Sequence, residues 1–242
     1  MRRFLTAWNF LTVIPLLPPR DLKADDIACG MAFFPAVGIV LGLLMAGVWW
    51  FASPHLSVSV LAALILALPV VLTGAIHVDG FVDTLDGLAV MGDRERRLAV
   101  MKDSRIGAVG AVGLVLLFLL KLEAVKVLNV ETALAALVLM PTVGRWAMVM
   151  TAWRSRYPRS DGTGKASVEA LGGLEVAAAS VIAAVPAIYL LGVGLVAPLV
   201  LVVAGVLVIR WLAHKSFGGV TGDVIGASNE CAEVLFLLGV LL

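Results

Sequence analysis

Long apolar stretches alternate with short polar loops along most of the chain. A helix that crosses the hydrocarbon core of a bilayer needs about 20 predominantly apolar residues. The pattern predicts membrane-spanning segments at residues 31–51, 57–76, 106–121, 132–153, 174–191, 194–212 and 230–242. At a rise of about 1.5 Å per residue the last one is too short to span alone, so it must begin earlier, tilt, or end inside the bilayer. We therefore expect an all-α fold, a polytopic helical bundle of about six or seven transmembrane helices that forms one domain over residues 1–242.

Basic residues are confined almost entirely to alternate loops. These loops lie within residues 2–23, 94–105, 154–165 and 210–215, whereas the intervening loops carry only Lys121 and Lys126. Lys and Arg next to membrane spans stay in the cytoplasm. The N-terminus is therefore predicted to be cytoplasmic, and nearly all polar motifs of the chain are predicted to face the same side.

The composition agrees with a membrane protein. Hydrophobic residues make up 61% of the chain, and the mean hydropathy is +1.05, whereas soluble domains are roughly 45–50% apolar. The net charge of +1 excludes the broad basic surface of a nucleic-acid-binding protein. Cys29 and Cys231 are far apart in the sequence, which favours neither a disulfide nor a thiolate metal site.

The segment HVDGFVDTLDG, residues 77–87, places three aspartates directly after an apolar stretch. On a helix, Asp79, Asp83 and Asp86 lie within an arc of about 60°. Carboxylates that close repel one another unless a cation lies between them, and hard oxygen ligands favour Mg²⁺ over zinc. These three residues are therefore predicted metal ligands, although a solvated helix start with acidic residues near its positive end would show the same pattern. His77 could be a general base, a metal ligand or a structural residue.

Two further features offer cations to a phosphorylated substrate. In MKDSRIG, Lys102 and Arg105 are candidate phosphate ligands, and Asp103 is a candidate catalytic base. Arg145 lies inside the span at 132–153, where a charged group is costly and is a functional hypothesis by default. It could reach a substrate phosphate, or it could pair with a buried carboxylate for structural reasons.

The segment GGVTGDVIGASNE, residues 218–230, combines glycines with polar side chains. Glycines allow backbone N–H groups to approach an anion closely. We therefore expect substrate binding at four positions of this segment: Gly219, Thr221, Gly222 and Asn229. Asp223 and Glu230 are candidate metal ligands, and Asp223 is also a candidate base.

These observations are compatible with four classes of protein. A Mg²⁺-dependent transferase acting on a phosphate or diphosphate accounts for the carboxylates, the basic residues and the glycine-rich segment together. A prenyltransferase would share the metal but usually has two aspartate-rich helices. A channel or transporter would place its charges near the bilayer midplane, and a non-catalytic subunit would need none of them.

Five segments in order carry a specific resemblance: FLTVIP, FFPAVGIVLG, TGAIHVDGFVDTLDGL, MKDSRIGAVG and GGVTGDVIGASNE. From about residue 4 to residue 238 the chain resembles the cobalamin synthase family, adenosylcobinamide-GDP ribazoletransferase. The resemblance implies an Mg²⁺-dependent membrane enzyme that joins adenosylcobinamide-GDP to α-ribazole, or to its 5′-phosphate, and releases GMP. His77, Asp103 and Asp223 all remain candidates for the general base.

The resemblance also implies a location and partners. We expect a multi-pass protein of the bacterial cytoplasmic (inner) membrane whose active site faces the cytoplasm. Its expected partners are the two small-molecule substrates and the lipid bilayer, with no nucleic acid. Other cobalamin-assembly enzymes and a second copy of the chain are further candidates.

Overall fold

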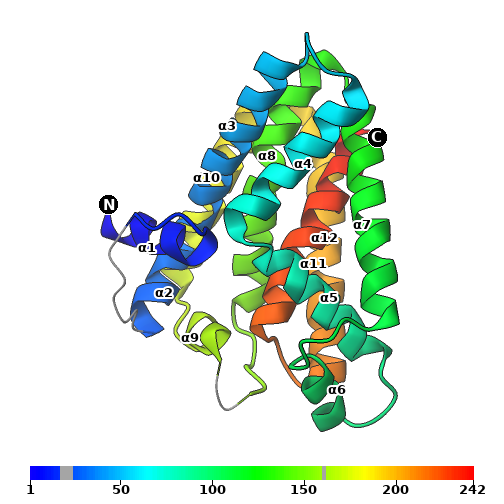
Figure 1. Cartoon of the computed structure of the whole chain (residues 1–242). Helices are drawn as coiled ribbons and strands as arrows, with labels where there is room; N and C mark the ends of the chain where they lie inside the picture. Colours follow the sequence, from blue (N-terminus) through cyan, green and yellow to red (C-terminus); the bar gives the residue numbers. More distant parts are fainter. Residues whose placement is uncertain (17–23, 160–161) are drawn as a thin grey trace.

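The computed structural model describes residues 1–16, 24–159 and 162–242, and every regular element in them is helical (Figure 1). The order is α1 (Arg2–Leu11), α2 (Ala24–Met31), α3 (Phe34–Ala52), α4 (Val58–Thr73), α5 (Ile76–Ala89), α6 (Arg94–Val100), α7 (Ala108–Lys126), α8 (Val130–Ala152), α9 (Thr163–Glu169), α10 (Gly173–Leu191), the 3₁₀ turn η1 (Gly192–Leu195), α11 (Val196–Phe217) and α12 (Gly222–Val240). The all-α prediction is confirmed. Arg20 and Lys23, two basic residues of the first loop, lie outside the described residues.

Each of the predicted apolar segments coincides with a helix, namely α3, α4, α7, α8, α10, α11 and α12. The last segment begins earlier than its apolar part, because Thr221 caps α12 by accepting a hydrogen bond from the Val224 N–H. The full helix has 19 residues, which resolves the problem of its length. Asn229 and Glu230 interrupt its apolar character, and for this reason the sequence pattern shows only its second half.

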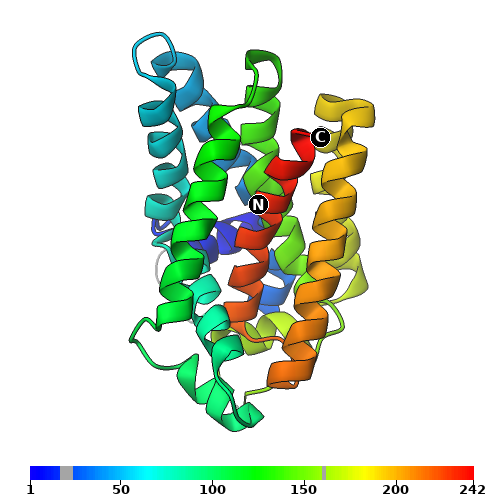
Figure 2. The ribbon, with the colours of Figure 1, turned by 90° about the vertical axis from the view of Figure 1, so that its right-hand side faces the viewer.

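Within the described residues, four stretches are long and apolar enough to cross a membrane: Phe34–Ala52, Ala108–Lys126, Glu131–Ala152 and Gly173–Phe217. The fourth contains both α10 and α11, and the chain reverses between them at η1 (Figure 2). The pair α4 and α5 adds a fifth if it is counted as one broken span. The helix α12 is more polar and packs against α5, α7, α8 and α11 within the bundle. A polytopic helical bundle is confirmed.

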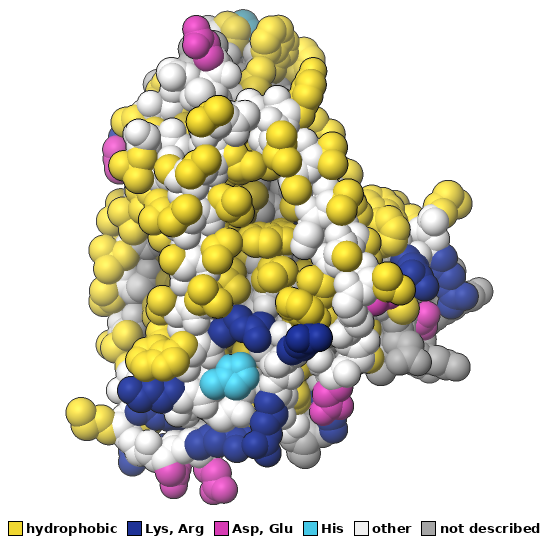
Figure 3. Space-filling view, turned by 180° about the vertical axis from the view of Figure 1, so that it is seen from behind, with side chains coloured by type: hydrophobic (Ala, Val, Ile, Leu, Met, Phe, Trp, Pro, Cys, Tyr) yellow, Lys and Arg dark blue, Asp and Glu magenta, His cyan; other side chains and the backbone are white. Residues whose placement is uncertain are grey.

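The outer surface of the bundle is largely apolar. Seen from behind, hydrophobic side chains cover most of its height, and Lys, Arg and His side chains gather toward one end (Figure 3). Figure 1 places α6 and α9 at that same end. This distribution agrees with a cytoplasmic basic end next to an apolar belt.

A sharp bend separates α4 from α5. The two helix axes differ by 90°, and Gly74 and Ala75 both have φ values in the left-handed region, 61° and 60°. Gly74 ends α4 by donating its N–H to the carbonyls of Val70 and Val71. The bend turns the aspartate-bearing helix away from the axis of α4 and brings it against the first part of α12.

The helices α3 and α8 are in close backbone contact. Gly38 and Gly42 of α3 face α8 so closely that a Cβ atom on either would lie 2.4 Å from a backbone oxygen, of Pro141 and Val138 respectively. Glycines four residues apart allow two helix backbones to approach in this way. The helices α3 and α8 therefore pack closely against each other, and α8 also packs against α12.

Candidate active site

The first turns of α5 and α12 bring acidic side chains from distant parts of the sequence together. A Cβ atom on Gly80 would lie 2.7 Å from the backbone oxygen of Asp223, so the two helices nearly touch at this point. The negatively charged neighbours of Asp83 include Asp79 and Asp223. The predicted helix over the aspartates is confirmed, and two of its three acidic residues share a region with Asp223.

One arginine accompanies this acidic group. Arg159 Nη2 lies 2.9 Å from Asp223 Oδ2, and its side chain is only 12% exposed. Thr221 Oγ1 also donates to Asp223 Oδ2, at 3.3 Å, while it caps α12. Asp223 is thus held by two neighbours from different segments, and the group as a whole keeps an excess of negative charge.

A cavity of about 110 Å³ adjoins the acidic group. His77, Asp79, Gly222 and Asp223 lie on its polar side. The His77 ring is 4% exposed, and its Nε2 atom has no hydrogen-bond partner among the described residues. Buried polar atoms are nearly always paired, so an unpaired buried ring nitrogen is unusual.

Asp86 belongs to a different contact. Its two carboxylate oxygens accept hydrogen bonds from the backbone N–H groups of Gly107 and Gly110, each at 2.8 Å. A Cβ atom on either glycine would lie 2.4 Å from an Asp86 oxygen. Asp86 therefore caps the start of α7, where each of its oxygens accepts one hydrogen bond.

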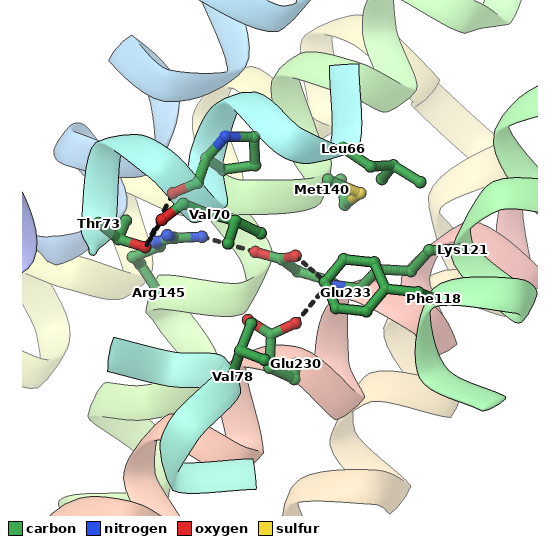
Figure 4. A pocket seen from close by; sticks show the side chains of 11 residues that line it. Leu66, Val70, Thr73, Val78, Phe118, Lys121, Met140, Arg145, Glu230 and Glu233 are labelled. Carbon is green, nitrogen blue, oxygen red and sulfur yellow. Dashed lines mark hydrogen bonds and ion pairs between the residues drawn. The ribbon is translucent and has the colours of Figure 1, made fainter. Parts of the chain in front are cut away.

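Glu230 and Arg145 are members of a buried ionic network (Figure 4). Lys121 Nζ lies 2.6 Å from both Glu230 Oε2 and Glu233 Oε2, and Arg145 Nη1 pairs with Glu233 Oε1 at 2.5 Å. Asn229 Nδ2 donates to both glutamates at 3.1 Å. Every residue of this network is at most 5% exposed. The structure thus places Glu230, Arg145 and Asn229 in one buried network, and their predicted contacts with metal and substrate stay predictions.

Met101 of MKDSRIG is buried, whereas Lys102, Ser104, Arg105 and Ile106 are exposed. Arg105 and Asp103 form a pair in which Nη2 and Oδ2 are 2.7 Å apart, and their side chains are 87% and 38% exposed. Hydrogen bonds from Arg105 lower the pKa of Asp103 to about 2. A carboxyl group with so low a pKa is a weak base, which favours His77 and Asp223 over Asp103 for proton transfer.

The predicted phosphate loop at Gly219 is joined to a neighbouring segment. The Val220 N–H donates to the Arg156 carbonyl at 2.8 Å, and Gly219 has a φ of 157°. A Cβ atom on Gly219 would lie 2.0 Å from the Arg156 oxygen. Because Gly219 has no side chain, its backbone can pack directly against the backbone of Arg156. This contact helps to place Arg159 beside Asp223.

Comparison with known proteins identifies the family. A family model described as cobalamin-5-phosphate synthase matches residues 3–241. The chain belongs to this family. An adenosylcobinamide-GDP ribazoletransferase of Geotalea daltonii is 39% identical and covers 98% of this chain and 96% of its own. A protein of the same name from Clostridium novyi is 33% identical over 100% and 97%. No solved structure matches the chain.

The predicted metal ligands of this cobalamin-5-phosphate synthase family member lie in several different contacts. Within the described ranges, no group of three or more His, Cys, Asp or Glu side chains is arranged to hold a metal ion. Asp86 and Glu230 have other partners. Asp79, Asp83 and Asp223 stay predicted ligands, since the charges of the other two act on Asp83 and Mg²⁺ commonly takes only one or two carboxylates, with water and phosphate oxygens completing its shell.

Three residues of the site region were missed in the sequence of this family member. Arg159 looked like an ordinary basic residue of a cytoplasmic loop, and only the tertiary contact pairs it with Asp223. Lys121 and Glu233 form the centre of the buried network. A signal existed for these two, because a lysine and a glutamate within apolar helices need partners of opposite charge.

Proposed function

We propose that this chain is an adenosylcobinamide-GDP ribazoletransferase, the enzyme of the final assembly step of cobalamin. The match to the family over residues 3–241 carries the proposal, together with full-length relatives that bear this name. A hydroxyl oxygen of α-ribazole, or of its 5′-phosphate, attacks the phosphorus linked to adenosylcobinamide. The bond from this phosphorus to the oxygen of GMP breaks, GMP leaves, and the hydroxyl proton passes to a base of the protein.

The acidic group at α5 and α12 accounts for binding of the diphosphate. Asp79, Asp83 and Asp223 would hold Mg²⁺, which when bound neutralises charge on the transferring phosphate and on the leaving GMP. Arg159 lies next to Asp223 and is the basic neighbour of this acidic group. Arg105 and Lys102, which are both exposed, would supply positive charge to the substrate phosphates.

Two residues of the cavity are suited to receive the hydroxyl proton. His77 and Asp223 both line the cavity, so each is within reach of a substrate that occupies it. Asp103 has a strong partner in Arg105 at the surface. We therefore assign the proton transfer to the pair His77 and Asp223, and we assign Asp103 to orienting Arg105.

The location follows from the distribution of charge. The basic end of the molecule, which carries the acidic group, would face the cytoplasm of a bacterial cell, and the apolar surface would lie in the inner membrane. Adenosylcobinamide-GDP and α-ribazole would then arrive from the cytoplasm. Other cobalamin-assembly enzymes and a second copy of the chain remain proposed partners.

The direct test uses the purified chain in detergent with adenosylcobinamide-GDP, α-ribazole and Mg²⁺, and it measures GMP release and corrinoid product. We expect both products in equal amounts. Asp93→Asn is a matched control, because Asp93 caps α6 at the surface of the same end and lies outside the proposed site. Release of pyrophosphate from a prenyl diphosphate, with no GMP from the corrinoid substrate, would instead indicate a prenyltransferase and refute the proposal.

A further inference from the structure

A groove runs between α10 and α11 on the outer surface of the bundle. Within the described residues, these two helices are joined through η1 and both pack on α8, but they hardly contact each other. Trp146, Met150 and Trp153 of α8 are four and three residues apart, so they share one face. All three are half-buried, whereas Met148 and Val149 of the same turn are buried. The groove therefore leaves one stripe of α8 partly uncovered.

The groove contains an apolar cavity of about 190 Å³. Phe236 lies at its base, and Ile188 of α10 and Leu199 of α11, which are 61% and 45% exposed, lie at its opening. Among the described side chains that line it, only Trp146 Nε1 and Ser180 Oγ are polar, and they form a hydrogen bond of 3.1 Å. The cavity exceeds the roughly 150 Å³ of an apolar cavity that binds benzene. It can therefore hold several methylene groups of a hydrocarbon chain.

Basic side chains lie at the cytoplasmic end of the groove, below the apolar surface (Figure 3). Arg210 Nη1 donates to the Trp153 carbonyl at 2.7 Å. The Arg154 guanidinium lies 4.9 Å from the centroid of the Trp153 ring, and Lys215 Nζ lies 4.8 Å from that of Trp211. In the part of the chain that the structure describes, these partners are carbonyls and indole rings, and none is a carboxylate. The basic group of Arg154, Arg210 and Lys215 therefore has positive charge that a bound anion can neutralise.

The tryptophans indicate the depth of this basic group in the membrane. Trp side chains concentrate at the level of the lipid headgroups, and Trp211 is 59% exposed. Arg210 lies eleven residues beyond Leu199 on α11, about 16 Å along the axis at a rise of about 1.5 Å per residue. Half of the hydrocarbon core of a bilayer is about 15 Å thick. A lipid whose phosphate lies at the basic group can therefore reach the cavity with an acyl chain.

We propose that this groove binds one anionic phospholipid of the cytoplasmic leaflet. Its phosphate contacts Arg154, Arg210 and Lys215, and one acyl chain runs over the uncovered stripe of α8 into the cavity. A free phosphate ion would gain nothing from the apolar groove, and a lipid without net charge would leave part of the basic group without a counter-charge. The groove is separate from the acidic group at α5 and α12, so the proposal does not depend on the transferase assignment.

The test measures which lipid the purified chain retains. Wild type in mild detergent receives phosphatidylglycerol, phosphatidylcholine or glycerol phosphate, and native mass spectrometry counts the molecules bound to each chain. We expect one retained phosphatidylglycerol per chain and a higher melting temperature with this lipid, because a ligand of the native state stabilises it. Equal retention of phosphatidylcholine, or an equal rise in melting temperature with glycerol phosphate alone, would overturn the proposal.

The first variant fills the cavity. Ala184 of α10 lines it and is exposed, so Ala184→Phe should weaken phosphatidylglycerol binding at least about tenfold, since exclusion of two methylene groups accounts for that factor. Ala178→Phe is the matched control, because Ala178 is exposed on the same helix but lies outside the cavity lining. The control should bind as wild type does. Equal binding by the two variants would overturn the proposal.

The second variant removes charge. Arg154→Gln combined with Lys215→Gln should weaken phosphatidylglycerol binding about thirtyfold, because each basic residue at an anionic surface contributes a factor of about five. Arg2→Gln combined with Arg3→Gln removes the same charge from exposed positions of α1 and should have little effect. An equal loss in both double variants would indicate general attraction to anionic lipid and overturn the proposal. A dimer that Ala184→Phe dissociates without loss of lipid would assign the groove to a second copy of the chain instead.

Discussion

Replacement of Lys121 by methionine is the most direct test of the buried ionic network. In the native chain two cations, Lys121 and Arg145, face two anions, Glu230 and Glu233. The network is therefore neutral, and Lys121→Met leaves one negative charge without a partner. Methionine has nearly the same length as the aliphatic part of lysine, so the substitution removes charge and little volume.

The expected loss of stability is large because the ionic network is buried. The side chains of Lys121 and Glu233 are 4% and 3% exposed, and Lys121 lies 2.6 Å from each carboxylate. Breaking one partner of such a buried pair costs about 3–5 kcal/mol. We expect Lys121→Met to lower the free energy of unfolding in mixed micelles by this amount. The helix α12 would then lose part of its attachment to α7, and transferase activity would fall with it.

Two further variants make the test specific. Lys121→Met combined with Glu230→Gln leaves one cation with one anion, so the double variant should recover most of the lost stability. Lys126→Met removes a cation from the same helix, but its partner Glu123 is 62% exposed, and such a surface pair contributes at most about 1 kcal/mol. If Lys121→Met and Lys126→Met unfold at the same denaturant concentration, the network does not stabilise the fold and our reasoning is wrong.

Three other predictions concern the site. Asp83→Asn should lower kcat/KM at least about a hundredfold while the melting temperature is kept, and chelation of Mg²⁺ should abolish GMP release in wild type; equal activity of variant and wild type across a Mg²⁺ titration would exclude a metal role. Arg105→Ala should raise the KM for adenosylcobinamide-GDP more than it lowers kcat, and an unchanged KM would exclude a phosphate contact. Gly110→Ala should cost about 1–3 kcal/mol in thermal unfolding, because its Cβ would lie 2.4 Å from Asp86; native stability would contradict the capping role.

Most of the fold could be predicted from the apolar pattern, because the bilayer requires long apolar helices and leaves few alternatives. The exceptions are elements that depend on contacts within the protein. The helix α12 is surrounded by other helices, so it tolerates Asn229 and Glu230 once Lys121 pairs with the glutamate. The bend at Ala75 was also unexpected, because a non-glycine residue with a φ of 60° leaves no clear signal in the sequence.

The candidate site was predictable in part. The spacing of the aspartates correctly predicted that they lie on one helix. The contacts of each aspartate, however, depend on which other helix packs against α5 at that position. Asp83 lies near Asp223 of α12, whereas Asp86 accepts a hydrogen bond at the start of α7. The glycines at 107 and 110 were the available signal for this second contact. For Arg145, the alternative of a buried carboxylate partner is confirmed, since Glu233 pairs with it.

The capping of α7 by Asp86 has a consequence for the segment between α5 and α7. Asp86 joins the end of α5 to the start of α7 by two hydrogen bonds. Arg97 also donates to the Leu88 carbonyl at 2.9 Å. These hydrogen bonds hold the two ends of the segment between α5 and α7 together. The cost of closing a loop grows only slowly with its length. This segment should therefore accept an inserted tag without disturbing the helices that hold the aspartates.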